Sequence, residues 1–214
     1  ITHDSDAPNS KRLCFIGVDN YAAGRQCGML VREAIPDGGK IMMFLAGLDG
    51  DNAQRRRQGV IDELFGRSSD PSRRDPTGTI LVSPDQKYTV LGCLTDGFDR
   101  SMAKENAKIT LTKHGDLACM VGLFEYNPPL LVEAIEDAER TGKVKVVAFD
   151  ENRATLQGIR DGKVFGTIVQ DPYQYGYLSV KLLAALVRGD RTMIPANKVI
   201  DVPARKIVQA NVDA

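Results

Sequence analysis

Short apolar runs alternate with amphipathic stretches along nearly the whole chain. The runs cover residues 13–18, 40–46, 79–83, 118–123, 144–149 and 164–169. Helices are expected over residues 21–33, 99–113, 128–138 and 177–188, and two more are expected to end at Gly66 and Gly162. In these stretches the apolar residues recur at spacings of three and four, as on a helix with one buried face. The alternation predicts an α/β fold, with a doubly wound parallel sheet between two layers of helices in a three-layer αβα arrangement.

The stretch from Val144 to Gly176 contains two of these runs, and each run ends on a polar side chain. The first run stops at Asp150 and the second stops at Gln170. Because the carboxyl ends of parallel strands lie along one edge of a sheet, where α/β proteins bind ligands, we expect the two side chains at the same edge. The dipeptide Asp171-Pro172 is expected to force the chain out of regular structure after the second strand.

Polar and aromatic residues follow other predicted strands in the same way. Asp4 comes after a short opening segment that looks like the end of a strand, and Asn127 lies just past the run 118–123. Phe98 opens the helix that follows the run 79–83. These side chains are therefore expected near the same edge.

Arg56 is predicted in the first turns of its helix, on the inward face. A cation near a helix N-terminus is unfavourable by about 0.3 to 1 kcal/mol, so a polar ligand or an acidic neighbour should compensate. Each of these residues also has a plain structural role open to it. Asp4 and Asp150 could be helix caps, Asn127 a turn residue, Phe98 a core residue and Arg56 one member of the solvated run 55–57.

Together these side chains have the chemistry to bind vicinal hydroxyl groups. Carboxylates accept hydrogen bonds, a guanidinium donates two in a fork and an amide does both, while an aromatic face covers the C–H side of a sugar ring. The sequence shows no nucleophile elbow, phosphate-binding lysine loop or metal-ligand spacing, so we expect neither an enzyme nor a cofactor. The candidate ligand-binding residues are Asp4, Arg56, Phe98, Asn127, Asp150 and Gln170.

Composition narrows the classes of partner. Lys plus Arg and Asp plus Glu each total 28, so the net charge is zero and nothing favours nucleic acid as a partner. No apolar run approaches the length of a membrane span. The four cysteines occur among apolar neighbours without a CxxC pair, which favours buried thiols, although a disulfide in an oxidising compartment stays open.

The chain resembles the type I periplasmic sugar-binding proteins of ABC transporters, the group that includes ribose-binding protein. The likeness covers essentially all residues and rests on motifs in a fixed order. These motifs are ITHDSD, IGVDN with AAGRQCG, NAQRRRQG, FDRSMAKENA, GLFEYNPP, VVAFDENRATLQGIRDGKVFGTIVQDPYQYG and LLAALVRGD. The resemblance implies two doubly wound lobes joined by three hinge strands, which close over one monosaccharide. It also implies sugar contacts at the same six residues, an extracytoplasmic or periplasmic location and a membrane permease as partner.

By this likeness, the chain divides between the two lobes. Residues 1–19 and 171–200 correspond to remnants of the N-terminal lobe, and residues 20–170 and 201–214 to the C-terminal sugar-binding lobe. Most of the N-terminal lobe is not represented, and the chain is expected to start in the middle of a longer protein. The apolar side of the helix 177–188 would then lose part of its cover, so we expect self-association of the fragment. Ser5 stands where some ribose binders have arginine, so the recognised hydroxyl pattern is expected to differ.

Two other classes of protein remain open from the sequence. The effector domain of a lac-repressor-type transcription regulator shares this fold and binds sugars in the same cleft. A doubly wound enzyme could instead hold a phosphate at the turn Gly47 to Asn52, ahead of a helix. That turn lacks the GxGxxG spacing and contains Asp49 and Asp51, which repel anions.

Overall fold

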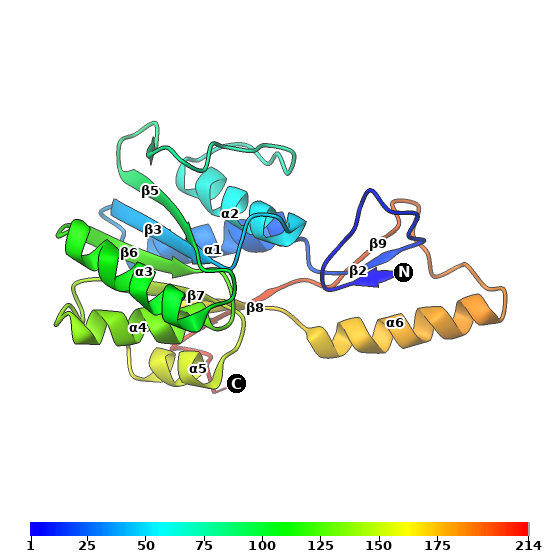
Figure 1. Cartoon of the computed structure of the whole chain (residues 1–214). Helices are drawn as coiled ribbons and strands as arrows, with labels where there is room; N and C mark the ends of the chain where they lie inside the picture. The colour runs from blue at the N-terminus through cyan, green and yellow to red at the C-terminus, as the bar shows by residue number, and fades with distance from the viewer. Residues whose placement is uncertain (214) are drawn as a thin grey trace.

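The computed structural model describes residues 1–213 and contains two sheets (Figure 1). The larger sheet has seven strands in the order β10-β8-β7-β6-β3-β5-β4, and the smaller has three in the order β1-β2-β9. The strands are β1 (Thr2–His3), β2 (Phe15–Gly17), β3 (Gly39–Leu45), β4 (Leu81–Val82), β5 (Tyr88–Thr95), β6 (Leu117–Gly122), β7 (Lys145–Phe149), β8 (Gly166–Val169), β9 (Val199–Asp201) and β10 (Arg205–Val208). The helices are α1 (Asn20–Ala34), α2 (Asp51–Leu64), α3 (Arg100–Lys113), α4 (Asn127–Asp137), α5 (Arg153–Arg160) and α6 (Pro172–Val187).

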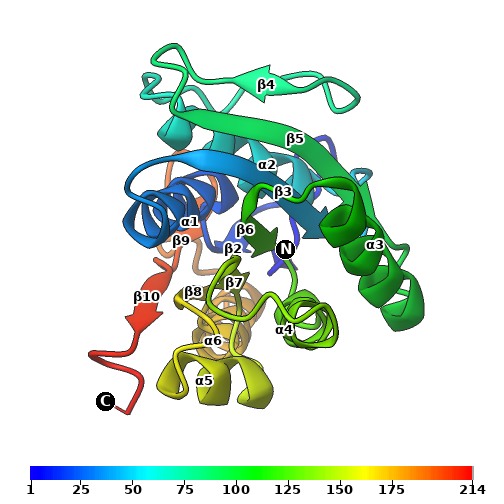
Figure 2. The ribbon, with the colours of Figure 1, turned by 90° about the vertical axis from the view of Figure 1, so that its left-hand side faces the viewer.

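Helices cover both faces of the larger sheet, which is why its strands are apolar on both sides. In β3, Ile41, Met43 and Leu45 pack into the cluster that contains α1 and α2. Met42 and Phe44, on the opposite face, pack into the cluster that contains α3, α4 and α5. Figure 2 shows α3 and α4 on the side of the sheet opposite α1. The expected α/β architecture, with a mainly parallel sheet between helical layers, is confirmed.

The strand next to β3 is not the one that the sequence pattern indicated. Of the predicted strand 79–83, only β4 forms, and it pairs antiparallel at the edge. The inner strand is β5, which the pattern missed because its sequence, YTVLGCLT, places the adjacent apolar pairs Val90-Leu91 and Cys93-Leu94 on either side of Gly92. This irregularity interrupts the two-residue alternation by which a strand is recognised.

The start of α6 also differs from the prediction. The helix was expected from Tyr177, with Asp171-Pro172 acting as a break, but it begins at Pro172. The Asp171 side chain accepts a hydrogen bond from the Gln174 backbone N–H at 3.0 Å. Proline is favoured at the first helical position because its missing N–H is not needed there. The dipeptide therefore starts the helix.

The smaller sheet lies beside α6, away from the larger sheet (Figure 1). Its strands are parallel to one another, and its core contains Cys14, Ile16 and Leu182, the last contributed by α6. The chain crosses from one sheet to the other at three places. These crossings lie between β2 and α1, between β8 and α6, and between β9 and β10. No helix within residues 1–213 combines the length and the apolar character that crossing a membrane requires.

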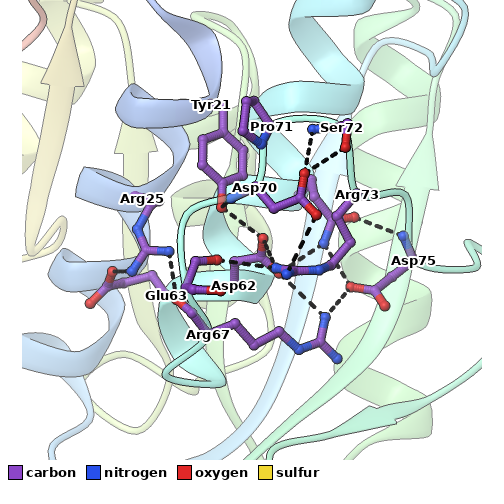
Figure 3. A network of polar contacts seen from close by, with 12 residues as sticks. Tyr21, Arg25, Asp62, Glu63, Arg67, Asp70, Pro71, Ser72, Arg73 and Asp75 are labelled. Atoms are coloured by element: carbon purple, nitrogen blue, oxygen red, sulfur yellow. Dashed lines mark hydrogen bonds and ion pairs between the residues drawn. The ribbon is translucent and has the colours of Figure 1, made fainter.

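A network of charged groups holds the loop after α2 against α1 and α2 (Figure 3). Asp62 is fully buried and accepts hydrogen bonds from the Tyr21 hydroxyl at 2.7 Å and from Arg73 at 2.6 Å. Arg67 bridges Asp62 at 3.3 Å and Asp75 at 2.6 Å. The segment 67–78, which its composition marks as a solvated loop, is thus tied to the two helices.

Asp62→Ala should lower the free energy of unfolding by roughly 3 to 5 kcal/mol, because it leaves buried donors and two arginines without their shared acceptor. Chemical denaturation measures the loss. Asp70→Ala is the matched control, since the Asp70 side chain is 41% exposed, pairs with Arg73 at 3.6 Å and otherwise accepts hydrogen bonds from Ser72 in its own turn. Equal losses in the two variants would contradict a central role for Asp62.

Self-association of the chain stays a prediction. The side of α6 with Leu178, Leu182 and Leu186 packs on the smaller sheet, so the apolar surface that is left exposed lies elsewhere on the helix. Val180 is 69% exposed and Val187 is 89% exposed. We expect the sedimentation coefficient of the 214-residue chain to rise with concentration. The double variant Val180→Lys, Val187→Lys should remove that rise. A concentration-independent monomer in sedimentation velocity would show the expectation to be wrong.

Candidate ligand-binding site

Five of the six candidate residues follow strands of the larger sheet at their carboxyl ends. Asp150 follows β7, Gln170 follows β8 and Phe98 lies three residues past the end of β5. Asn127 is the first residue of α4, after β6, and Arg56 is in the second turn of α2, after β3. Parallel strands end along one edge, so these residues share the rim where the strand order reverses around β3. Asp4 follows β1 of the smaller sheet.

The Arg56 guanidinium is buried at this rim and is held on several sides. Its Nε donates to Asn20 Oδ1 at 2.8 Å, and its Nη1 donates to the Leu123 carbonyl at 2.9 Å. The guanidinium carbon lies 3.9 Å from the centre of the Phe149 ring. Burial lowers the pKa of Arg56, and the charge of Asp150, whose Oδ2 is 3.8 Å from Nη1, opposes that shift. The prediction that Arg56 faces inward is confirmed.

Two glycines allow α1 and α2 to approach closely enough for this contact. A Cβ on Gly24 would lie 2.3 Å from the Arg56 carbonyl oxygen, and one on Gly59 would lie 2.3 Å from the Tyr21 carbonyl oxygen. Neither distance is possible for a real side chain, so only glycine fits at this helix crossing. The close approach brings Asn20, at the start of α1, to the Arg56 side chain.

Asp150 and Gln170 are joined, as their positions in the sequence predicted. Gln170 Nε2 donates to Asp150 Oδ1 at 2.6 Å, and the Thr167 hydroxyl donates to the Asp150 carbonyl at 2.7 Å. Burial raises the pKa of the Asp150 carboxyl, while Arg56 and the bond from Gln170 oppose the rise. Asp4 also raises this pKa, which places its charge near the same group.

Three candidate residues share an unusual backbone conformation. Asp4, Phe98 and Asp150 have φ values of 63°, 66° and 65°. Residues other than glycine rarely adopt the left-handed region, and such strain is concentrated at functional sites. None of the three is a helix cap, so that alternative for Asp4 and Asp150 is excluded.

The second part of the rim is aromatic. The Phe98 ring is 70% exposed, so the alternative that it is a core residue is excluded. It lies 5.9 Å from Phe124 in an edge-on arrangement and 6.2 Å from Tyr126. Asn127 is fully buried, and its Nδ2 donates to Asp96 Oδ2 at 3.0 Å.

Phe124 connects the two parts of the rim. Its ring lies 5.5 Å from the Arg56 guanidinium carbon on one side and 5.9 Å from the Phe98 ring on the other. The charged group of Asp4, Arg56, Asp150 and Gln170 is therefore continuous with the aromatic group that contains Asn127. The rim combines a buried cation, carboxylates, amides and an exposed aromatic ring.

Sequence reasoning missed several residues that hold the site together. Asn20 and Asp96 act on Arg56 and Asn127 by hydrogen bonds across the fold, which no local pattern reveals. Phe124 and Tyr126 follow β6 directly, so the strand-end rule could have selected them. Tyr175, in the first turn of α6, also reaches the site: its hydroxyl lies 3.4 Å from Gln170 Oε1, and burial raises its pKa to about 12.

Five cavities in the described part of the chain are lined by residues other than the six candidates. One of them, beside Asp19 and Asn20, is also lined by Phe15 and Val199 of the smaller sheet. Within residues 1–213, no group of three His, Cys, Asp or Glu side chains is arranged to hold a metal ion. The arrangement offers hydrogen bonds and an aromatic face, which suits the binding of a polar ligand.

Comparison with known proteins shows the family and the fold to which this chain is similar. Residues 1–191 match a family model described as "Periplasmic binding protein domain". The chain is 25% identical over 192 residues to the ribose import binding protein RbsB of Haemophilus influenzae, covering 89% of this chain and 58% of that protein. It is 24% identical over 211 residues to the xylose/arabinose-binding protein XylF of Sulfolobus acidocaldarius, covering 95% of this chain and 46% of that protein. The chain thus spans less than two thirds of the length of these curated relatives.

Solved structures show the same fold. GanP, a glucose-galactose binding protein from Geobacillus stearothermophilus, superposes with a TM-score of 0.85 at 24% identity, over 100% of this chain and 68% of that one. An ABC transporter solute binding protein from Burkholderia graminis, solved in complex with D-arabinose, gives a TM-score of 0.85 at 25% identity, with the same coverage.

Gly24→Ala should destabilise the protein by about 1 to 3 kcal/mol, because a methyl group inside van der Waals distance of the Arg56 carbonyl forces the helices apart. Thermal and chemical denaturation measure the change. Gly176→Ala in α6 is the matched control, since nothing lies within 4 Å of its added Cβ. That control should stabilise the helix by up to about 1 kcal/mol. Similar losses in both variants would contradict the requirement for close helix contact.

Proposed function

The chain belongs to the periplasmic binding protein family, and we propose that it acts in a solute-binding protein of an ABC sugar importer, which binds one monosaccharide by closure of two lobes. One observation carries this proposal. Arg56, Asp150 and Gln170 meet on one rim, and that rim continues through Phe124 to the exposed Phe98 ring. Hydroxyl groups need donors and acceptors, and the C–H face of a sugar needs an apolar surface.

The candidate residues divide the work of binding between them. Arg56 donates to ligand oxygens, and Asp150 accepts from ligand hydroxyls. Gln170 and Asp4 extend this polar surface, while Phe98 covers one face of the ring. Asn127 binds the ligand from the aromatic part of the rim. The side chains of Arg56, Asp150, Gln170 and Asn127 are already held by protein partners, so little of their order is lost on binding.

The two sheets fit the proposed division into lobes. We assign residues 20–170 and 201–214 to a C-terminal lobe, and residues 1–19 and 171–200 to part of an N-terminal lobe. The three connections between the sheets would then be the hinge. A sugar that contacts both lobes stabilises the closed form, and a membrane permease recognises that form on the extracytoplasmic side.

A binding role is favoured over catalysis and over gene regulation. The curated relatives that match are named as binding proteins for sugars. A lac-repressor-type effector domain has the same fold, but these relatives are named for import or for sugar binding. The turn Gly47 to Asn52 lacks the GxGxxG spacing and contains Asp49 and Asp51, which repel anions, so a phosphate site there is disfavoured.

The proposal predicts that a monosaccharide stabilises the complete protein. Thermal-shift and calorimetric screens should cover pentoses, hexoses and 6-deoxyhexoses. A sugar at a hundred times its dissociation constant should add about 2.7 kcal/mol of stability. Asp150→Asn should weaken binding at least about thirtyfold, because an acceptor for a ligand hydroxyl is lost beside the buried Arg56.

Glu105→Gln, an exposed position on α3, serves as the control and should bind like the unchanged protein. If a phosphorylated metabolite stabilised the protein and no monosaccharide did, the transport proposal would be wrong.

A further inference from the structure

A buried carboxylate, Asp96, lies behind the aromatic part of the rim. It directly follows β5, and only 6% of its surface is exposed. Its Oδ1 accepts from the Phe98 backbone N–H at 3.0 Å and from the Tyr126 hydroxyl. Its Oδ2 accepts from Asn127 Nδ2 at 3.0 Å. Burial, together with the Asp96 carboxylate, raises the pKa of Tyr126, so the phenol remains a donor.

These contacts fix the orientation of the Asn127 side chain. The two ends of an amide have nearly the same shape, but one donates hydrogen bonds and the other accepts them. A carboxylate that three donors face can only accept, so the NH2 end of Asn127 must point to Asp96. The oxygen end of Asn127 therefore cannot bond to Asp96. Asn127 Oδ1 is buried and has no hydrogen-bond partner in the protein.

A buried acceptor without a donor is unfavourable, and a ligand that supplies the donor removes that deficit. We propose that Asp96 is a positioning residue that presents Asn127 Oδ1 to the ligand as an acceptor, so that this side of the site recognises the proton of a ligand hydroxyl group. This inference rests on the proposed sugar-binding function and specifies which chemistry the site selects there.

The same arrangement occurs in the charged part of the rim. Gln170 Nε2 donates to Asp150 Oδ1 at 2.6 Å, which directs Gln170 Oε1 away from the carboxylate. Both candidate amides are thus oriented by a carboxylate. Gln170 Oε1 lies 3.4 Å from the Tyr175 hydroxyl, whereas Asn127 Oδ1 is buried without a protein partner. The guanidinium of Arg56 is the donor among the six candidate residues. The site therefore suits an uncharged polyol, whose hydroxyls can both donate and accept, better than a phosphate or carboxylate group.

Asp96→Asn should invert the preference of Asn127, which would then present a hydrogen-bond donor to the ligand in place of an acceptor. The new amide would keep its oxygen toward the Phe98 N–H and the Tyr126 hydroxyl, because both of these donate to one oxygen. Its NH2 end would then replace Oδ2 opposite Asn127. Two NH2 groups cannot bond to each other, so Asn127 has to turn over and present its own NH2 end to the ligand.

Monodeoxyfluoro analogues of the tightest-binding sugar of the screen test the inversion, because fluorine can accept weakly but cannot donate. In the unchanged protein, fluorine at the carbon facing Asn127 should weaken binding about tenfold or more, since the acceptor stays unpaired. In Asp96→Asn, the same analogue should bind at least as tightly as the parent sugar. Glu105→Gln is again the control: it leaves Asp96 and Asn127 in place, so it should keep the discrimination of the unchanged protein. If Asp96→Asn weakens the parent and every analogue by the same factor, Asp96 is only structural and the inference is overturned.

Nuclear magnetic resonance tests the orientation without any sugar. In protein labelled with ¹⁵N-asparagine, the Asn127 side-chain signals are those missing from Asn127→Asp. One Nδ2 proton should exchange slowly with water, and this protection should disappear in Asp96→Asn. Unchanged Asn127 signals would overturn the inference. If no sugar binds, the proposed function fails, but these spectra still decide how Asn127 is oriented.

Discussion

The site depends on a positive charge held where burial disfavours it. The Arg56 side chain is only 4% exposed, and its nearest carboxylate oxygen, from Asp150, is 3.8 Å away. Neutral groups do most of the compensation, through the Asn20 oxygen, the Leu123 carbonyl and the Phe149 ring. Because no tight ion pair neutralises its charge, the guanidinium can still attract an oxygen-rich ligand.

That environment exists only because α1 and α2 touch at their backbones. Gly24 and Gly59 let the helices approach, and the buried acid Asp62 fastens them through the Tyr21 hydroxyl. The network around Asp62 has no contact with the rim, yet it fixes the helix pair that carries Arg56. The stability of this helix pair and the geometry of the rim therefore depend on the same contacts between α1 and α2.

Strain and order are concentrated on the rim in a way that suits a pre-formed binding surface. Asp4, Phe98 and Asp150 hold left-handed backbone conformations, which the surrounding sheet must enforce. The amides of Asn127 and Gln170 are each held by a carboxylate. A surface arranged in this way loses little side-chain freedom when a ligand binds.

The periodicity of the sequence was enough to predict the layered fold and the strand-end residues, since burial of both sheet faces and the directions of parallel strands follow from local patterns. It failed at β5, where Gly92 breaks the alternation, and at α6, where a cap looked like a break. Local patterns could select Asp150 and Gln170 but not Asn20, which reaches Arg56 from another segment. Asp96 was not selected because β5, the strand that it follows, was itself missed. Only the tertiary structure decided which side chains meet, which end of the Asn127 amide is left without a partner and that the Arg56 charge has no tight ion pair. Those properties come from contacts between residues far apart in the chain.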